Sequence, residues 1–377
     1  MRTTSLLGMV LFPALVACGG ASESPSEILG RESSAIQGGT SDTKKAHNFA
    51  VGIGNIRYGA VCSGTLIAPN LVLTARHCVV PPTGSEAVTC SDKFPTKNVD
   101  PSTLFVTTEP SLRAARKPRW AKEIITPQDR AFCGNDIALI MLEDNIPETE
   151  AEPATPVVQF SMTDRTKVGG EITAVGYGIT SPSASDSGVR RIREKIEIVC
   201  VPGDESYDCK KNGYGRMLDS DKEFITEGYV CSGDSGSGAF EQKSFDRGTP
   251  YVLGALSRGP QTDDRCLAAI YSRTDEHADM IIEAGKKAAK AGGYAEPEWV
   301  SPAVEPTSAD PETGTVCEGE TCTATDVTEP AATHAPATAS STGCSAAPRG
   351  TSSGSSLGVL ACVGLAALVI GRRRRAS

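Results

Sequence analysis

The sequence carries no excess of positive charge and no metal-binding pattern. The first absence argues against nucleic-acid binding, and the second argues against a metal site. Lysine and arginine number 37 against 46 aspartates and glutamates, for a net charge of -9. Nucleic-acid binding needs a basic surface and is therefore not expected. The one basic cluster, Arg372 to Arg375, follows an apolar run. No CxxC pair or His/Cys cluster occurs, so neither a metal nor a cofactor is expected.

Long apolar runs are also missing. The stretch Leu6 to Ala17 is too short to span a bilayer and is typical of a secretory signal, which we place at residues 1–17. It ends in Leu15-Val16-Ala17-Cys18, which resembles the lipobox of bacterial lipoproteins, where the cysteine is acylated. An ordinary signal peptide that contains a cysteine is the alternative. Residues 18–35 are expected to be a propeptide.

The C-terminal segment, residues 356–377, joins a second short apolar run to four arginines. With Gly343-Cys344 it resembles the sorting tail of myxobacterial surface proteins, in which the cysteine is processed by envelope sorting machinery. A plain membrane anchor is the alternative, although Leu357 to Ile370 is marginal for a span. We therefore expect export to the cell envelope, with the membrane contacting the termini, or release outside the cell.

The middle of the chain divides into a globular part, residues 36–293, and a stalk, residues 294–355. The stalk is rich in Ala, Thr, Pro, Ser and Glu and is expected to be disordered. In the globular part short apolar segments between turn residues predict strands: 48–53, 61–67, 71–75, 136–142, 171–176, 192–199 and 251–256. One helix follows, capped by Thr274 or Asp275. Many strands and one closing helix indicate an all-β fold.

Three polar residues stand in settings that suit amide hydrolysis, which needs a nucleophile, a base and donors for the oxyanion. His77 ends a predicted strand, and Asp136 begins another. Ser235 lies in Gly233-Asp234-Ser235-Gly236, where the glycines permit a sharp turn and the Gly233 and Ser235 amides can form an oxyanion hole.

These segments resemble successive landmarks of the chymotrypsin/trypsin family of serine proteases. They stand in the family's order: Ile36 to Gly39, Cys62 to Gly64, Thr74 to Cys78, Asp136 to Ile140, Gly176 to Gly178 and Cys231 to Gly236. The order His, Asp, Ser separates this family from subtilisins and α/β-hydrolases. The resemblance implies two packed six-stranded antiparallel β-barrels over 36–293. It also implies His77 as general base, Asp136 as its orienting partner and Ser235 as nucleophile.

The resemblance also implies activation by cleavage before Ile36. In the family the new α-ammonium pairs with the aspartate that precedes the serine, here Asp234. The residue before the cut is Ala35, where trypsinogen-like zymogens carry a basic residue, so the activating protease is expected not to be tryptic.

Several positions depart from the family pattern and bear on specificity. Arg76 replaces an alanine, Gly236-Ser237-Gly238 replaces Gly-Gly-Pro, and Ser257-Arg258-Gly259 replaces Ser-Trp-Gly. Tyr229 stands where trypsin-like members carry an aspartate at the pocket floor, and the walls map to Gly259 and Ala269. We therefore expect small or medium apolar residues to be preferred over Arg and Lys.

Thirteen cysteines indicate an oxidising compartment. By the resemblance, Cys62–Cys78 and Cys231–Cys266 match family disulfides. For the others we propose Cys90–Cys133 and Cys200–Cys209, with Cys317–Cys322 in the stalk.

The sequence therefore predicts an exported serine endopeptidase that acts on protein or peptide substrates and is made as a zymogen. A catalytically dead relative is one alternative. A non-catalytic binding module displayed by the stalk and an esterase with the same triad are two others.

Overall fold

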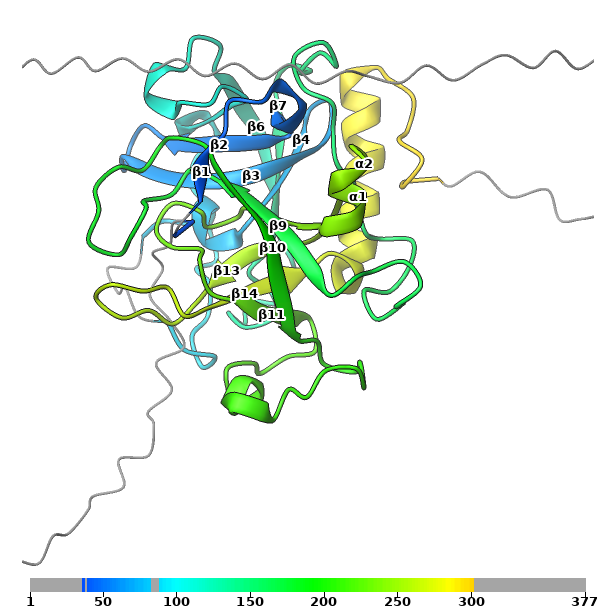
Figure 1. The fold of residues 1–377 in the computed structure, drawn as a ribbon. Helices are drawn as coiled ribbons and strands as arrows, with labels where there is room; N and C mark the ends of the chain where they lie inside the picture. The colour runs from blue at the N-terminus through cyan, green and yellow to red at the C-terminus, as the bar shows by residue number, and fades with distance from the viewer. Residues whose placement is uncertain (1–35, 38, 83–87, 302–377) are drawn as a thin grey trace, which may run out of the picture. The chain divides into compact units, whose positions relative to one another are not determined.

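The computed structural model describes residues 36–37, 39–82 and 88–301, all within the first of the chain's two units, Met1–Ala309 (Figure 1). The predicted signal, propeptide and sorting tail lie outside the described residues. So do Cys18, Cys344 and the Cys317–Cys322 pair.

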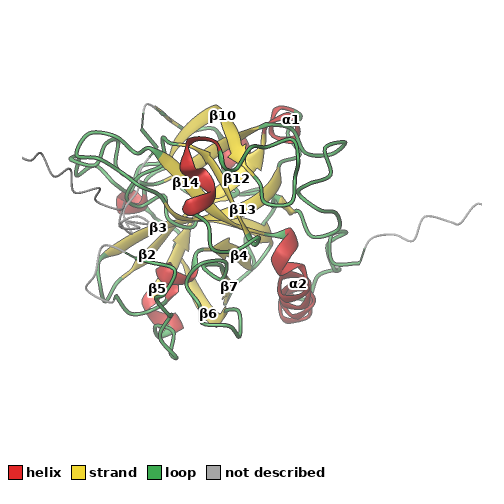
Figure 2. Ribbon diagram, turned by 90° about the horizontal axis from the view of Figure 1, so that it is seen from below, coloured by secondary structure: helices red, strands yellow, loops and turns green. Residues whose placement is uncertain are grey.

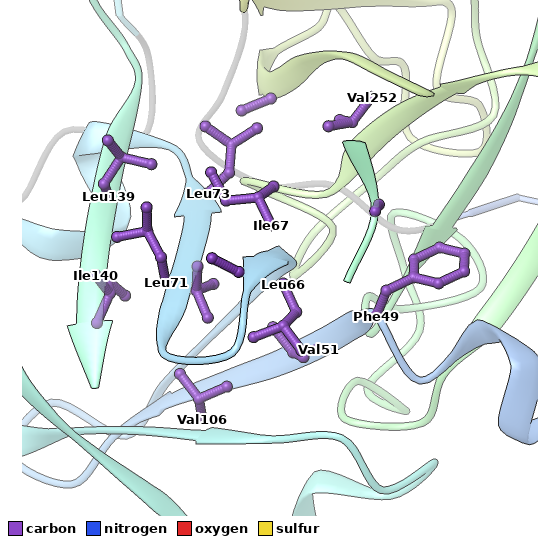
Figure 3. Close-up of a cluster of buried hydrophobic side chains, with 14 of the residues drawn as sticks. Phe49, Val51, Leu66, Ile67, Leu71, Leu73, Val106, Leu139, Ile140 and Val252 are labelled. Carbon is purple, nitrogen blue, oxygen red and sulfur yellow. The ribbon is translucent and has the colours of Figure 1, made fainter. Parts of the chain in front are cut away.

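The first half of the described chain closes into a six-stranded antiparallel barrel, with strand order β2-β3-β4-β7-β6-β5. Its strands are β2 (Ala50–Asn55), β3 (Ala60–Ala68), β4 (Leu71–Thr74), β5 (Leu104–Thr107), β6 (Arg119–Ile125) and β7 (Ala138–Leu142). Aliphatic side chains such as Val51, Leu66 and Leu139 fill the interior (Figure 3). This barrel carries His77 just after β4 and Asp136 just before β7.

The second half forms another six-stranded antiparallel barrel, ordered β10-β11-β14-β13-β12-β9 and closed by pairing of β9 with β10. Its strands are β9 (Glu171–Gly176), β10 (Arg191–Cys200), β11 (Glu223–Glu227), β12 (Gly238–Glu241), β13 (Tyr251–Arg258) and β14 (Ala268–Arg273). Two short strands join this sheet, β1 (Thr40–Ser41) beside β10 and β8 (Thr155–Pro156) beside β13. The predicted pair of packed barrels is therefore confirmed (Figure 2).

Two α-helices accompany the barrels, α1 (Gln242–Asp246) and α2 (Ala278–Gly292). The 3-10 turns are η1 (Lys45–His47), η2 (Arg76–Val79), η3 (Pro101–Thr103), η4 (Leu112–Ala114), η5 (Lys211–Arg216) and η6 (Asp275–His277). The closing helix begins later than its expected cap, because residues 275–277 form a 3-10 turn first. Although α2 follows the second barrel, it packs against β3, β4 and β7 of the first (Figure 2). No helix among the described residues is long and apolar enough to cross a membrane.

The predicted start of the stalk at residue 294 is too early. Beyond α2 the chain folds back, and Trp299 and Val300 are buried in the core beside Ile281. The indole Nε1 of Trp299 donates a hydrogen bond to the carbonyl of Ile67 at 3.1 Å. The composition of 294–355 hid this because only the first few residues of that range carry large apolar side chains. We call residues 294–301 the C-terminal strap.

Four disulfides close loops around the barrels, and their pairings agree with those predicted. They are Cys62–Cys78, Cys90–Cys133, Cys200–Cys209 and Cys231–Cys266. The first pins the turn that carries His77 to β3, and the last pins the segment before Ser235 to the loop before β14.

Candidate active site

His77 and Asp136 meet through the edge that β4 shares with β7. Antiparallel pairing of Thr74 with Ala138 brings the end of β4 beside the start of β7. The Nδ1 of His77 lies 2.8 Å from Oδ2 of Asp136, and the His77 amide donates to Oδ1 at 2.9 Å. One carboxylate therefore fixes both the backbone and the ring of the histidine.

Asp136 is fully buried, and serines complete its environment. The hydroxyl of Ser257, near the end of β13, donates to Oδ2 at 2.6 Å, and Ser272 donates to the Asp136 carbonyl at 3.0 Å. Burial by itself would raise the pKa of the Asp136 carboxyl. The neighbouring His77 and the donated hydrogen bonds outweigh burial and hold the pKa below its ordinary value. A carboxylate held ionised in this way can orient an imidazole and stabilise its cation.

Ser235 lies on a tight loop between two glycines that adopt positive φ angles. Gly233 has φ +94° and Gly236 has φ +82°, a region that favours glycine. A side chain at Gly236 would place its Cβ 2.1 Å from Oγ1 of Thr74, so only glycine lets the loop approach the end of β4 this closely. Cys78, the neighbour of His77, places its Sγ 3.5 Å from the Ser235 carbonyl oxygen. The loop therefore brings Ser235 against the turn that carries the histidine.

Ser63 on β3 ties this loop to both barrels. Its amide donates to the Ser235 carbonyl at 2.8 Å, and its hydroxyl donates to the Gly233 carbonyl at 2.8 Å. The same hydroxyl accepts a hydrogen bond from the Tyr177 amide at 2.9 Å. These bonds turn the carbonyls of the loop toward β3.

Ile36 and Gln37 lie against the segment that leads to this loop. The Ile36 side chain is fully buried in the core of the second barrel, and the Gln37 amide donates to the Tyr229 carbonyl. Asp234, also fully buried, accepts hydrogen bonds from the Gly178 amide at 2.9 Å and the Cys231 amide at 3.3 Å.

Burial raises the pKa of the Asp234 carboxyl to about 7, although the two amides oppose the shift. Arg191 acts on this carboxyl through space. Within the described ranges no cationic side chain forms an ion pair with it.

The predicted pocket residues lie at the adjoining ends of the paired strands β11, β13 and β14. Tyr229 has φ +94°, and its ring stacks under the guanidinium of Arg193, 3.4 Å from the ring centroid. Gly259 is irreplaceable at its position, because a Cβ there would lie 2.1 Å from the Ala268 carbonyl oxygen. Ala269 is buried in the core of the second barrel. The specificity expected from these residues stays a prediction.

Among the described residues, Cys62, His77 and Cys78 are the one group of three metal-ligating side chains that lie within 4.8 Å of one another. Both sulfurs belong to one disulfide and cannot act as thiolate ligands. This cluster is therefore unsuited to a metal.

The family model described as Trypsin matches residues 36–281. The chain belongs to the trypsin family. It is 27% identical over 229 residues to phenoloxidase-activating factor 3 of Holotrichia diomphalia, covering 58% of this chain and 62% of that protein.

Two further proteins are similar to this chain. CLIP domain-containing serine protease B4 of Anopheles gambiae is 29% identical over 245 residues, which cover 60% of this chain and 62% of the relative. A trypsin of Saccharopolyspora erythraea is 24% identical over 254 residues, which cover 66% of this chain and 97% of the relative. The chain thus spans less than two thirds of the length of the first two relatives.

Sequence reasoning missed several contributors to the site. It assigned Ser257 to the substrate pocket alone, but the hydroxyl of this residue supports Asp136. The burial of His47 and His277 was not predicted either. His47 lies 3.1 Å from Asp42, and Nε2 of His277 lies 2.8 Å from the Gly134 carbonyl oxygen. The His277 contact joins segments 143 residues apart, which the local sequence does not reveal.

Proposed function

We propose that this chain is an exported serine endopeptidase that cleaves protein or peptide substrates through an acyl-enzyme. The observation that carries this proposal is the contact set at Asp136, where His77 and Ser257 converge on one buried carboxylate. The contact of Ser235 with the turn that carries His77 supports it.

In this proposal His77 takes the proton of Ser235 as the hydroxyl attacks the scissile carbonyl. It then returns the proton to the leaving amine. Asp136 holds the imidazole in the required tautomer and stabilises its cation. The Gly233 and Ser235 amides meet the oxyanion. A water molecule then gives a proton to His77 and attacks the acyl carbon. The carboxylic acid product leaves, and Ser235 regains its proton from His77.

Activation by cleavage before Ile36 is part of the proposal. The carboxyl of Asp234 is buried, with amide donors but no ion-pair partner in the described part of the chain. A free α-ammonium at Ile36 would supply the charge that holds this carboxylate ionised, and Ile36 already packs in the same core. We expect the pocket predicted from Tyr229, Gly259 and Ala269 to accept small or medium apolar residues.

The test uses two forms of the chain, intact and cut between Ala35 and Ile36, each with a Ser235→Ala control. Both are incubated with a peptide library and with a matched amide and ester substrate. We expect the cut parent alone to cleave amide bonds, preferentially after apolar residues. Ester cleavage without amide cleavage would support the esterase instead, and dominant cleavage after Arg or Lys would overturn the specificity.

The sequences of the two chain ends bear on how the protease is attached to the cell envelope. If Cys18 is acylated, cleavage before Ile36 separates the lipid from the protease, because no other cysteine lies between residues 1 and 35. Attachment to the envelope then depends on the segment that contains Cys344. Mass spectrometry of the mature enzyme should find no lipid, and a mature enzyme still lipidated at Cys18 would contradict this route.

A further inference from the structure

Two buried arginines lie next to residues of the site. Arg76 precedes His77 and is 4% exposed, and Arg258 follows Ser257 and is 1% exposed. Both positions carry uncharged residues in the family pattern described above. Burying a guanidinium costs free energy unless its charge and donors are satisfied, so each arginine requires a local partner.

The partners include two stacked phenylalanines. The rings of Phe94 and Phe132 have centroids 4.8 Å apart and an interplanar angle of 21°. The guanidinium of Arg76 lies over Phe94, 4.7 Å from its centroid. That of Arg258 lies over Phe132 at 5.8 Å. We call these four residues, in the order Arg76, Phe94, Phe132 and Arg258, the arginine–phenylalanine stack.

The backbone around the rings is itself braced. The Phe94 amide donates to the Arg130 carbonyl at 2.8 Å, and Nε of Arg130 donates back to the Phe94 carbonyl at 2.7 Å. A disulfide between Cys90 and Cys133 joins the same two segments. The two rings are therefore presented by a cross-linked pair of segments, one of which runs directly into Asp136.

The Arg258 end of the stack is anchored to the loop before Asp136. Arg258 forms a fully buried ion pair with Glu223 of β11, with contacts of 2.5 and 3.1 Å. The same Glu223 carboxylate accepts a hydrogen bond from the Gly134 amide at 2.9 Å. Gly134 lies two residues before Asp136, so the ion pair fixes the backbone that presents the carboxylate.

The Arg76 end carries a charge with no carboxylate ion pair in the described part of the chain. Its Nη1 donates to the Asp129 carbonyl at 2.5 Å. Arg76 also interacts through space with the charges of Asp136, Asp129 and Arg130. A fixed cation at this position favours the ionised form of Asp136 and disfavours a cation on the adjacent His77.

We propose that the arginine–phenylalanine stack is a positioning device that sets the spacing of the three segments carrying His77, Asp136 and Ser257. This proposal rests on the proposed protease activity. Arg76 and Arg258 each pack on one ring, and the two rings pack on each other. The contacts therefore fix the distance between the segment of His77 and the segment of Ser257. None of the four side chains needs to touch substrate, so they are positioning residues.

The test replaces the rings by leucine and reads catalysis and stability separately. We expect Phe94→Leu and Phe132→Leu to lower kcat about tenfold with KM changed less than about threefold, since the predicted pocket residues Tyr229 and Ala269 lie outside the stack. Phe160→Leu is the matched control. Its ring also carries a cation, Lys167 at 4.7 Å, and an aromatic neighbour, Tyr251 at 5.7 Å, but these contacts lie outside the site.

The charge of Arg76 is tested by Arg76→Ala, which places the family's usual residue at this position. We expect the acidic limb of the kcat/KM profile to move upward by about half a pH unit or more, because loss of a nearby cation raises the pKa of His77. Arg76→Lys keeps a cation at this position and should therefore show a smaller shift than Arg76→Ala. A role confined to folding would lower stability without moving the profile.

The proposal is overturned if both ring variants match Phe160→Leu in kcat and Arg76→Ala leaves the acidic limb in place. A cut parent that never cleaves amides would instead refute the proposed activity. In that case the free energy of unfolding still tests the stack, through a double-mutant cycle of Arg76→Ala with Phe132→Leu, because Arg76 lies over Phe94 while Phe132 carries Arg258. Non-additive losses of the free energy of unfolding would support a stack that acts as one unit, and strictly additive losses would refute it.

Discussion

At the scale of single residues, two buried carboxyls, one before β7 and one before β12, behave in opposite ways. Asp136 receives a hydrogen bond from Ser257 and faces His77, and its pKa lies below its ordinary value. Asp234 is equally buried but has amide donors alone, and its pKa rises to about 7. The contrast follows from what each carboxylate faces, because burial disfavours charge at both.

The Ser257 hydroxyl is the contact that the sequence interpretation overlooked, and it gives a direct prediction. Removing a hydrogen bond to a buried charge costs about 1.5–3 kcal/mol, so Ser257→Ala should lower kcat about tenfold to a hundredfold. Ser272→Ala is the matched control, because its hydroxyl donates to the backbone carbonyl of Asp136 instead. Equal losses in the two variants would show that the carboxylate contact has no special role.

Asp234 makes the stability of the uncut chain depend on pH. Between about pH 4 and pH 7 the folded chain keeps a proton on Asp234 that the unfolded chain has released. Stability from this group is therefore complete below about pH 4 and is lost as pH rises toward 7, by at most about 1.4 kcal/mol per pH unit. Thermal unfolding of the uncut parent and of Asp234→Asn should diverge across this window, and parallel curves would contradict the shift.

At the scale of elements, strands were predictable where apolar residues are dense and bounded by turn residues. The segments assigned to β2, β3, β4, β7, β9, β10 and β13 were found within a few residues of their bounds. Five barrel strands were not predicted. β6 mixes charged residues with apolar ones because part of its surface faces solvent, and β12 spans only Gly238–Glu241. Their strand identity depends on neighbours distant in sequence, which local patterns do not contain.

The C-terminal strap is the clearest example of such long-range dependence. Trp299 is 6% exposed, and a Cβ at Gly285 of α2 would lie 2.5 Å from its ring, so the helix and the tryptophan fit only with a glycine there. We expect Trp299→Ala to lower the free energy of unfolding by about 3 kcal/mol or more. Urea unfolding measures this, with the exposed Glu298→Ala as control. A loss no larger than that of the control would mean that the strap does not stabilise the barrel.

At the scale of the whole molecule, the order of the motifs was sufficient to predict both barrels, two of the four disulfides and the approach of His77 to Asp136. The burial of the Arg258 side chain could not be predicted from the sequence, because its partners Glu223 and Phe132 come from segments far from it in the sequence.

The central claim is that Ser235 is an activated nucleophile once Ile36 is freed. The most direct measurement is labelling by a fluorophosphonate, read by intact mass on the cut chain and on its Ser235→Ala variant. The account predicts one label per molecule of cut parent, none on Ser235→Ala and much slower labelling of the uncut chain. A folded, correctly cut parent that takes up no label would contradict the account and favour a binding module on the same fold.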